Sequence, residues 1–289
     1  MILLLGGSGY VGQAFVANLQ TRGLDFTAPK HADLEATSVE AVSRLVQDCR
    51  PDFVINAIGY TGRPNIDSTE HEKLRCLEAN TTVPGVLAEV LGTQGIPFGH
   101  VSSGCIFDGT RSDGLPFTEE DPPNFAFGHP NASWYSRTKA MAETLLKDCP
   151  DCLIWRLRIP FDQFDNERNY LTKLMRYERL LEVTNSISQL QEFADACVET
   201  LIRRVPAGLY NVTNPGVVKT SEVAAAIRRH GLSDKDFQFF TDEEDFLSTP
   251  GRVKRASCSL SSDKLTATGI KLREVHEALD WSLQHFSPK

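Results

Sequence analysis

The sequence lacks a long apolar run, an excess of basic residues and a cysteine framework, and each absence excludes a class of protein. Its apolar stretches are short and interrupted, so no membrane partner is expected. The net charge of −8 argues against a nucleic-acid partner, which requires a basic face. The apolar start has no basic leader and contains glycines, which argues against a signal peptide. The seven cysteines are scattered, as expected for reduced thiols in a cytoplasmic protein.

Metal-ligand spacing and internal repeats are lacking too. The seven histidines show no spacing typical of a metal site, so no metal is expected. Cys149 and Cys152 have the spacing of a redox motif. They lie where a helix is expected to end and a strand to begin, so we interpret them as packing thiols. A chain of 289 residues is long enough for one large α/β domain and a smaller lobe.

The first residues present combine an apolar strand, a glycine-rich turn and a helix. Residues 2–5 are apolar, and glycines follow at three-residue intervals. Glycine in such a turn allows positive φ and lets a pyrophosphate approach the backbone N–H groups, while the helix directs its positive N-terminal end toward that phosphate. The arrangement predicts a dinucleotide site formed by Gly6, Gly9, Tyr10, Val11 and Gly12.

Strand-like and helix-like segments alternate along the rest of the chain, which predicts an α/β fold with a parallel sheet. After a short strand at 25–28, the further strands are expected at 52–59, 97–102, 153–159 and 208–213. Helices are expected at 39–49, 70–92, from 134 onward, and at 170–181, 191–203, 222–230 and 272–286.

The end of the second expected strand bears on the choice of cofactor. In a Rossmann unit this position carries an acid for a ribose 2′-hydroxyl or a base for a 2′-phosphate. Here Lys30 follows the strand, and the first acidic residue after it is Asp33, which is followed by Leu34. All three residues are expected beside the cofactor. A lysine attracts a 2′-phosphate, so the sequence favours NADPH and leaves NADH open, with a solvated loop as the alternative. Ala57 and Gly59, which end the next strand, are expected beside the cofactor.

Three polar side chains suggest acid–base chemistry. Tyr135 and Lys139 are four residues apart, so they lie one turn apart on one face of a helix. An ammonium beside a phenol favours the phenolate and is expected to lower the pKa of the tyrosine toward neutrality. Ser103 follows an expected strand, where its hydroxyl could hold a substrate carbonyl against that phenol. Each feature is weak by itself, but together, behind the glycine turn, they form a strong signal for acid–base chemistry.

With the glycine turn and Asn80, these residues make the chain resemble an extended short-chain dehydrogenase/reductase. The closer similarity is to dTDP-4-dehydrorhamnose reductases, above all to bifunctional UDP-4-keto-6-deoxyglucose 3,5-epimerase/4-reductases. The segments that carry it are 61–65 (TGRPN), 104–107 (GCIF), 135–141 (YSRTKAM), 168–173 (RNYLTK) and 213–218 (TNPGVV). They are spread over most of the chain, so the resemblance is not confined to the cofactor half.

The resemblance implies a Rossmann-type, doubly wound parallel sheet with a smaller C-terminal α/β lobe. The division expected is a cofactor domain over 1–155, with 190–212 returning to it, and a sugar-nucleotide lobe over 156–189 and 213–289. It also implies hydride transfer from a nicotinamide, with Tyr135 as proton donor to the C4 oxygen, Ser103 orienting the ketone and Lys139 tuning Tyr135 and holding the ribose. Asn80 would support a proton relay through water. A homodimer is what the family suggests.

Cys105 and Lys173 distinguish the bifunctional enzymes from a reductase alone. A 4-ketone acidifies the hydrogens at C3 and C5, and inverting either carbon needs a base on one face and a proton donor on the other. The bifunctional enzymes resemble this chain in having a cysteine two residues after the catalytic serine and a lysine in the Arg-Asn-x-x-Thr-Lys segment. For the pair, catalysis is favoured over a buried thiol and a solvated lysine.

The substrate expected is a UDP- or dTDP-4-keto-6-deoxyhexose, and the product a nucleotide-β-L-rhamnose. The residues expected to contact it are Thr61, Arg63, Asn65, Asn169, Asn185, Ser186 and Arg255. The cluster of Arg252, Lys254 and Arg255 could hold a diphosphate or be solvated. Two alternatives remain: a reductase without epimerase activity, and a non-catalytic NADP-binding regulatory subunit.

Overall fold

A six-stranded parallel sheet forms the centre of the computed structural model, which describes residues 1–287. The strand order is β10-β5-β4-β3-β1-β2, so the order reverses between β1 and β3. Ligands of open α/β sheets bind in the crevice at such a reversal, outside the carboxyl ends of the strands. The strands are β1 (Ile2–Leu5), β2 (Phe26–Thr27), β3 (Phe53–Asn56), β4 (Phe98–Ser103), β5 (Cys152–Leu157) and β10 (Gly208–Asn211).

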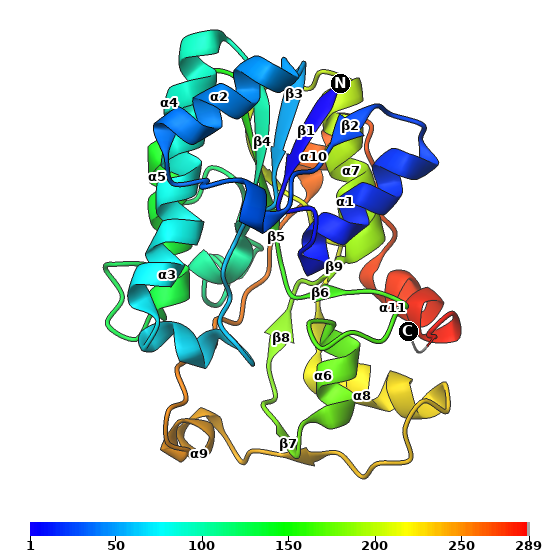
Figure 1. Cartoon of the computed structure of the whole chain (residues 1–289). Coiled ribbons are helices and arrows are strands. Elements are labelled where there is room, and N and C mark those ends of the chain that lie inside the picture. Colours follow the sequence, from blue (N-terminus) through cyan, green and yellow to red (C-terminus); the bar gives the residue numbers. More distant parts are fainter. Residues whose placement is uncertain (288–289) are drawn as a thin grey trace.

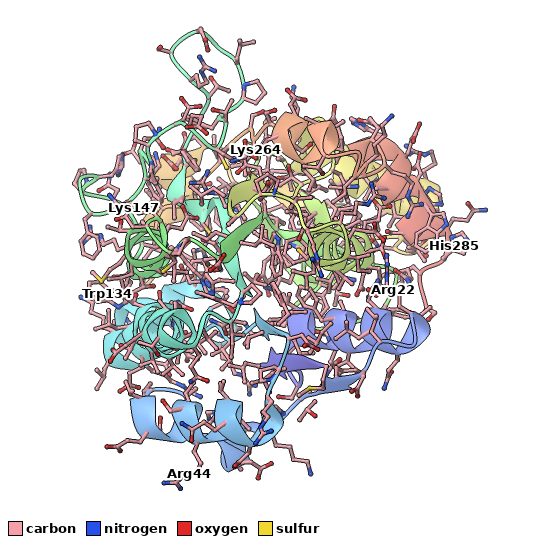
Figure 2. The ribbon with its side chains drawn as sticks, turned by 90° about the horizontal axis from the view of Figure 1, so that it is seen from above. Arg22, Arg44, Trp134, Lys147, Lys264 and His285 are labelled. Atoms are coloured by element: carbon pink, nitrogen blue, oxygen red, sulfur yellow. The ribbon has the colours of Figure 1, made fainter. Side chains whose placement is uncertain are left out.

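Helices cover both faces of this sheet (Figure 1). On one face, α1 (Tyr10–Thr21) and α7 (Leu190–Ile202) pack together through a core that includes Phe15 and Phe193. The other face is covered by α2 (Val39–Cys49), α4 (Val83–Gln94) and α5 (Trp134–Leu146). Seen from above, Trp134 of α5 and Arg22, which follows α1, lie on opposite sides of the molecule (Figure 2). The predicted doubly wound parallel fold is confirmed.

A smaller lobe lies beyond the carboxyl ends of the strands (Figure 1). Its core includes Phe161, Leu171, Ile227 and Leu279. Its helices are α6 (Tyr170–Arg176), α8 (Thr220–Arg229), α9 (Glu243–Ser248) and α11 (Val275–Gln284). Its short strands are β6 (Pro160–Phe161), β7 (Arg179–Leu180), β8 (Thr184–Asn185), β9 (Ser188–Gln189), β11 (Val218–Lys219) and β12 (Gln238–Phe239).

The expected division into two domains remains a prediction. Two observations on the packing bear on it: β10 joins the main sheet beside β5, and α10 (Asp263–Ala267) packs against β10. Leu265 and Ile270 therefore belong to the core around α1 and α7, although they follow the lobe in the sequence. Among the described residues, the helices are all too short or too polar to cross a membrane.

The helix expected over 70–92 is interrupted, and its boundaries were predicted wrongly. The segment contains a 3-10 turn, η2 (Ile66–Glu70), then α3 (Lys73–Leu77), a π-helical turn, η3 (Glu78–Thr82), and only then α4. A π-turn adds a residue to the helical ladder and commonly marks a functional site. Apolar periodicity could not reveal it, because buried side chains continue on both sides of the turn.

Other element boundaries differ from the expected ones for local reasons. The strand expected over 153–159 ends at Leu157, and Ile159 has a positive φ of 37°, which redirects the chain into the smaller lobe. Pro160 follows in β6, which pairs with β9 at Ser188 in a separate two-stranded sheet. The helix expected over 170–181 ends at Arg176, and residues 179–180 form β7.

A buried ion pair fixes α5 against the sheet. Arg156 of β5 is 1% exposed and forms a forked contact with Glu143 of α5, with Nη2 donating to Oε2 at 2.8 Å. Ser102 of β4 donates its hydroxyl to the same carboxylate at 2.6 Å. Because α5 carries Tyr135 and Lys139 while β4 ends in Ser103, this pair aligns the elements that form the site.

We expect Glu143→Gln to lower the free energy of unfolding by about 3–5 kcal/mol, because it leaves the Arg156 guanidinium buried without a counter-charge. The matched control is Arg176→Gln, which breaks an ion pair with Asp165 whose arginine is 58% exposed and should cost about 1 kcal/mol or less. Urea unfolding of the two variants and the parent checks this. Equal losses in both would contradict the importance assigned to the buried pair.

Candidate active site

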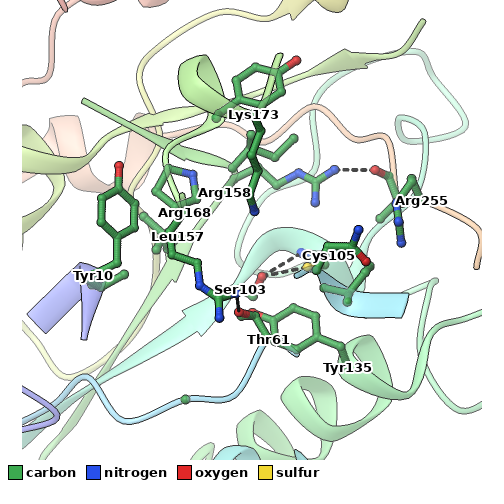
Figure 3. A pocket seen from close by; sticks show the side chains of 18 of the residues that line it. Tyr10, Thr61, Ser103, Cys105, Tyr135, Leu157, Arg158, Arg168, Lys173 and Arg255 are labelled. Carbon is green, nitrogen blue, oxygen red and sulfur yellow. Dashed lines mark hydrogen bonds between the residues drawn. The ribbon is translucent and has the colours of Figure 1, made fainter. Parts of the chain in front are cut away.

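A cavity of about 870 Å³ opens at the carboxyl ends of the strands, between the sheet and the smaller lobe (Figure 3). Fifteen of the predicted site residues line it. From the cofactor half these are Gly9, Tyr10, Val11, Ala57, Gly59, Tyr135 and Lys139, and from the catalytic and substrate sets Thr61, Arg63, Asn65, Ser103, Cys105, Lys173, Asn185 and Arg255. The structure therefore brings together residues from both halves of the chain.

The glycine turn has the geometry that close approach of a phosphate requires. Gly6 has a φ of 81°, and a Cβ there would lie 2.7 Å from the Ile58 nitrogen. A Cβ on Gly12 would lie 2.0 Å from the Gly6 carbonyl oxygen, so α1 can begin here only with glycine. Gly9 caps α1 without a side-chain hydrogen bond, which leaves the first N–H groups of the helix facing the cavity.

The residues proposed to select the cofactor lie outside this cavity lining. Lys30 is exposed, and Asp33 belongs to a 3-10 turn, η1 (His31–Asp33), after β2. Leu34 packs against the core beneath α2 and α4. The preference for a 2′-phosphate therefore stays a prediction from the sequence.

The phenol and the amine of α5 are both buried at the cavity wall. Ser133 caps the helix, and its hydroxyl accepts a hydrogen bond from the Ser136 N–H. Tyr135 is 7% exposed and Lys139 is 4% exposed. The Lys139 ammonium donates to the Val101 carbonyl at 2.9 Å, and burial lowers the pKa of Lys139 to about 8.

The expected direction of the Tyr135 pKa is wrong in this structure. Burial raises that pKa, and the charge of Cys105 raises it further, while the contact with the Ser103 hydroxyl lowers it. Desolvation of the phenolate thus exceeds any stabilisation by a neighbouring cation. A neutral phenol is the form that donates a proton, so the raised pKa fits an acid better than a base.

Asn80 lies behind the cavity wall, in the π-turn η3. Its side chain accepts from the Tyr60 N–H at 2.8 Å and donates to the Tyr60 carbonyl at 2.9 Å. A Cβ on Gly59 would be 3.4 Å from the Asn80 oxygen and 3.5 Å from the Lys139 nitrogen. Asn80 therefore supports the backbone of Gly59 and Tyr60 next to Lys139, and it does not itself line the cavity.

The hydroxyl and thiol after β4 are adjacent. The Ser103 hydroxyl caps a 3-10 turn, η4 (Gly104–Ile106), by accepting from the Cys105 N–H at 3.2 Å. It also lies 2.9 Å from the Cys105 sulfur. Cys105 is half-buried and lines the cavity, so the thiol is accessible from the same space as Tyr135.

Lys173 reaches the cavity from the smaller lobe. Asn169 caps α6 through its side-chain oxygen, which accepts from the Leu171 N–H at 3.0 Å. Burial, together with the charges of Arg168 and Arg255, lowers the pKa of Lys173 to about 8. Figure 3 shows Lys173 extending toward Ser103 and Cys105 from across the cavity.

Two residues that were predicted to contact the substrate do not line the cavity. Asn169 is fully buried, and its amide donates to the carbonyls of Asp162 and Phe164, so it holds α6 in place. Ser186 is also buried, and its hydroxyl accepts from the Leu260 N–H at 3.0 Å. Both residues lie behind the cavity wall, where they support residues that line it.

The basic cluster near the C-terminal end is divided. Arg252 and Arg255 line the cavity, and both donate to Asp67, at 3.0 and 2.7 Å. Burial would raise the pKa of Asp67, but hydrogen bonds and charge from the two arginines outweigh it and lower that pKa. Lys254 turns away and pairs with Asp108 and Glu243.

The comparison with known families decides the assignment. A family model described as the RmlD substrate binding domain matches residues 1–287. The chain belongs to this family. The resemblance to dTDP-4-dehydrorhamnose reductases and related epimerase-reductases, predicted from the motifs, is confirmed.

Two relatives of this RmlD family member come from Arabidopsis thaliana. A bifunctional dTDP-4-dehydrorhamnose 3,5-epimerase/dTDP-4-dehydrorhamnose reductase is 31% identical over 96% of this chain and 90% of the relative. A trifunctional UDP-glucose 4,6-dehydratase/UDP-4-keto-6-deoxy-D-glucose 3,5-epimerase/UDP-4-keto-L-rhamnose-reductase is 33% identical over 96% of this chain, which spans 40% of that longer relative.

A solved structure of similar sequence shares the whole fold. The crystal structure of a UDP-rhamnose synthase from Acanthamoeba polyphaga mimivirus is 25% identical, covers 98% of both chains and has a TM-score of 0.89. The Rossmann-type sheet and the smaller lobe are therefore both shared with that synthase.

The cavity residues of this RmlD family member that sequence reasoning did not assign to the site include Arg158, Arg168 and Tyr170. Arg158 stands just after β5, and the carboxyl end of a parallel strand is where ligands bind, so its position was an available signal. Arg168 donates to the Thr61 hydroxyl and the Gly62 carbonyl, at 3.1 and 2.7 Å, and so joins the two halves across the cavity. That contact depends on the tertiary fold and leaves no pattern in the sequence.

We expect Lys139→Met to change how stability depends on pH. Between the folded pKa of about 8 and the usual 10.5, the unfolded chain binds a proton at Lys139 that the folded chain does not. The contribution of Lys139 to stability therefore rises with pH across this window. The parent should gain stability relative to the variant from about pH 7.5 to about pH 10, as measured by urea unfolding.

The control is Lys147→Met, at the exposed end of the same helix. The parent and this variant should keep a constant difference across the same window. A constant difference for Lys139→Met as well would contradict the lowered pKa.

Proposed function

We propose that this chain reduces the C4 ketone of a nucleotide-4-keto-6-deoxyhexose with NADPH, after inverting C3 and C5, to give a nucleotide-β-L-rhamnose. The observation that carries this is the convergence of Ser103, Tyr135, Cys105 and Lys173 on one cavity that begins at the glycine turn. A reductase needs only the first two. The names of the Arabidopsis thaliana and mimivirus relatives support the same chemistry.

The residues of the turn fit a dinucleotide. The left-handed Gly6, the close approach of Gly12 and the uncapped start of α1 leave N–H groups for a pyrophosphate. Ala57 and Gly59 border the same space. NADPH, when bound, supplies the hydride for C4. NADH remains an alternative, because the preference for a 2′-phosphate rests on Lys30 alone.

Reduction needs a proton at the C4 oxygen. Tyr135, kept neutral by its raised pKa, donates that proton, and Ser103 orients the carbonyl from the end of β4. Lys139 holds the cofactor ribose with its ammonium. Asn80 supports the return of the proton from solvent, through the Tyr60 backbone that it binds.

Inversion at C3 and C5 needs two groups on opposite faces of the sugar ring. Cys105 belongs to the turn after β4, while Lys173 comes from α6 in the smaller lobe, so the two reach the cavity from different sides. With a pKa of about 8, Lys173 both gives and takes a proton near neutral pH. The pair thus supplies what a reductase alone does not require.

The remaining contacts of the substrate follow the cavity wall. Thr61, Arg63, Asn65 and Asn185 line it, and Arg255 is placed to meet the diphosphate. Whether the nucleotide is UDP or dTDP is left to the experiment below. The homodimer and the cytoplasmic location remain predictions from the sequence.

The decisive experiment incubates the purified protein with UDP- or dTDP-4-keto-6-deoxyglucose in D₂O. Without cofactor, deuterium should appear at C3 and C5, and adding NADPH should then give the rhamnose nucleotide. If no deuterium appears at either carbon, nucleotide-4-keto-rhamnose, which is already inverted, is supplied with NADPH, and its reduction would indicate a reductase alone. No turnover with any of these nucleotides would favour a regulatory subunit.

Two variants should separate the half-reactions. Tyr135→Phe removes the proton donor, so reduction should fall about 10²–10⁴-fold while deuterium exchange persists. Cys105→Ser should abolish the exchange but retain reduction of nucleotide-4-keto-rhamnose, which is already inverted. Mass spectrometry and NADPH absorbance measure the two steps. Loss of both activities in each variant would contradict the division of roles.

A further inference from the structure

Two arginines near the end of β5 are both buried, but they differ in what neutralises them. Arg156 is paired with Glu143. Arg158, 5% exposed, donates from Nη2 only to neutral oxygens, those of the Asn185 side chain and the Ala256 carbonyl. No carboxylate among residues 1–287 forms an ion pair with it, and its Nε has no hydrogen-bond partner within that range. An arginine stays charged at any accessible pH, so a buried one without an acid is costly.

The guanidinium of Arg158 lies beside Cys105. Its aliphatic stem packs on Gly104, where a Cβ would be 3.3 Å from the Arg158 Cδ. The Arg158 charge interacts most strongly with the buried Cys258 thiol, next with the Cys105 thiol, and more weakly with the Tyr135 phenol. Figure 3 shows Arg158 and Tyr135 on opposite sides of Cys105. The cavity wall thus holds a permanent cation next to a thiol that faces the substrate space.

Four titratable groups lie close enough to Cys105 to interact with it: Tyr135, Lys139, Arg158 and Cys258. The phenol and the second thiol are neutral at neutral pH, because burial raises the pKa of both. The pKa of Lys139 is about 8, so its charge is lost as the pH rises through that value. Arg158 is therefore the one cation of this set whose charge does not depend on pH.

We propose that Arg158 is a positioning residue for epimerisation, the counter-ion that holds Cys105 as a thiolate able to remove a proton from the sugar. This rests on the proposed function. The thiolate takes the proton from C5 or C3 and becomes a thiol, while the C–H electron pair moves into the enolate with its charge on the C4 oxygen. The Lys173 ammonium then donates a proton to the other face of that carbon, the ketone re-forms, and the amine and thiol return to their starting forms by exchange with water.

A purely structural role is the alternative for Arg158. Its contacts to Asn185 and Ala256 tie β8 to the segment before Cys258, and losing them could loosen the cavity wall. The test must therefore read the state of the thiol directly and must show that the rest of the site is intact.

The test compares the parent with Arg158→Lys, which keeps a charge, and Arg158→Gln, which does not. The rate of Cys105 alkylation by iodoacetamide is followed by peptide mass spectrometry from about pH 6 to about pH 10. At pH 7 the Gln variant should react about tenfold more slowly than the parent, the Lys variant should lie between them, and all rates should converge at high pH. Reduction of nucleotide-4-keto-rhamnose by NADPH, which does not use the thiol, serves as the control for an intact site.

In the same variants, deuterium exchange at C3 and C5 should fall in parallel with alkylation, and by a larger factor than reduction does. Equal alkylation profiles in the parent and the Gln variant would overturn the proposal. So would parallel loss of exchange and reduction, which would indicate a structural role. If the parent itself shows no exchange, the epimerase half of the proposed function fails, and the alkylation profiles still decide whether Arg158 controls the thiol.

Discussion

The forked contact between Arg156 and Glu143 is the interaction on which the site depends. It joins β5 to α5, and the Ser102 hydroxyl extends it to β4, so three elements share one buried carboxylate. Two of these elements carry residues of the candidate site near this contact: Ser103 on β4 and Tyr135 on α5. A buried pair of this kind adds little net stability but fixes relative positions, and reaction at a ketone needs such fixed positions.

The fold was predictable because its signals are local. A buried apolar strand, the spacing of three glycines and the alternation of strands with amphipathic helices are each contained in one stretch of sequence. The helix over residues 39–49 was predicted with its observed bounds. The π-turn at Asn80 and the left-handed Ile159 were missed, because each depends on how neighbouring elements pack. Neither residue type is typical of the conformation that it adopts.

The candidate site was predictable for the same reason, but only in part. Ser103, Tyr135 and Lys139 sit in short motifs, so they were found, and they line the cavity together. Asn169 occurs in such a motif too, and Ser186 was also predicted to contact the substrate, but both side chains form hydrogen bonds inside the smaller lobe. The pKa of Tyr135 was predicted in the wrong direction, because spacing along a helix shows proximity to a cation and not the depth of burial. Arg158 was missed because a missing acid partner is visible only in three dimensions.

The contact of Asp67 with Arg252 and Arg255 has a consequence for how the enzyme would exchange its ligands. The carboxylate already pairs with one nitrogen of each guanidinium group that faces the cavity. If the arginines bind the substrate diphosphate as proposed, that diphosphate must compete with a group built into the protein, which lowers its net affinity. Substrate and product would carry the same diphosphate, so this internal competitor would weaken the binding of both.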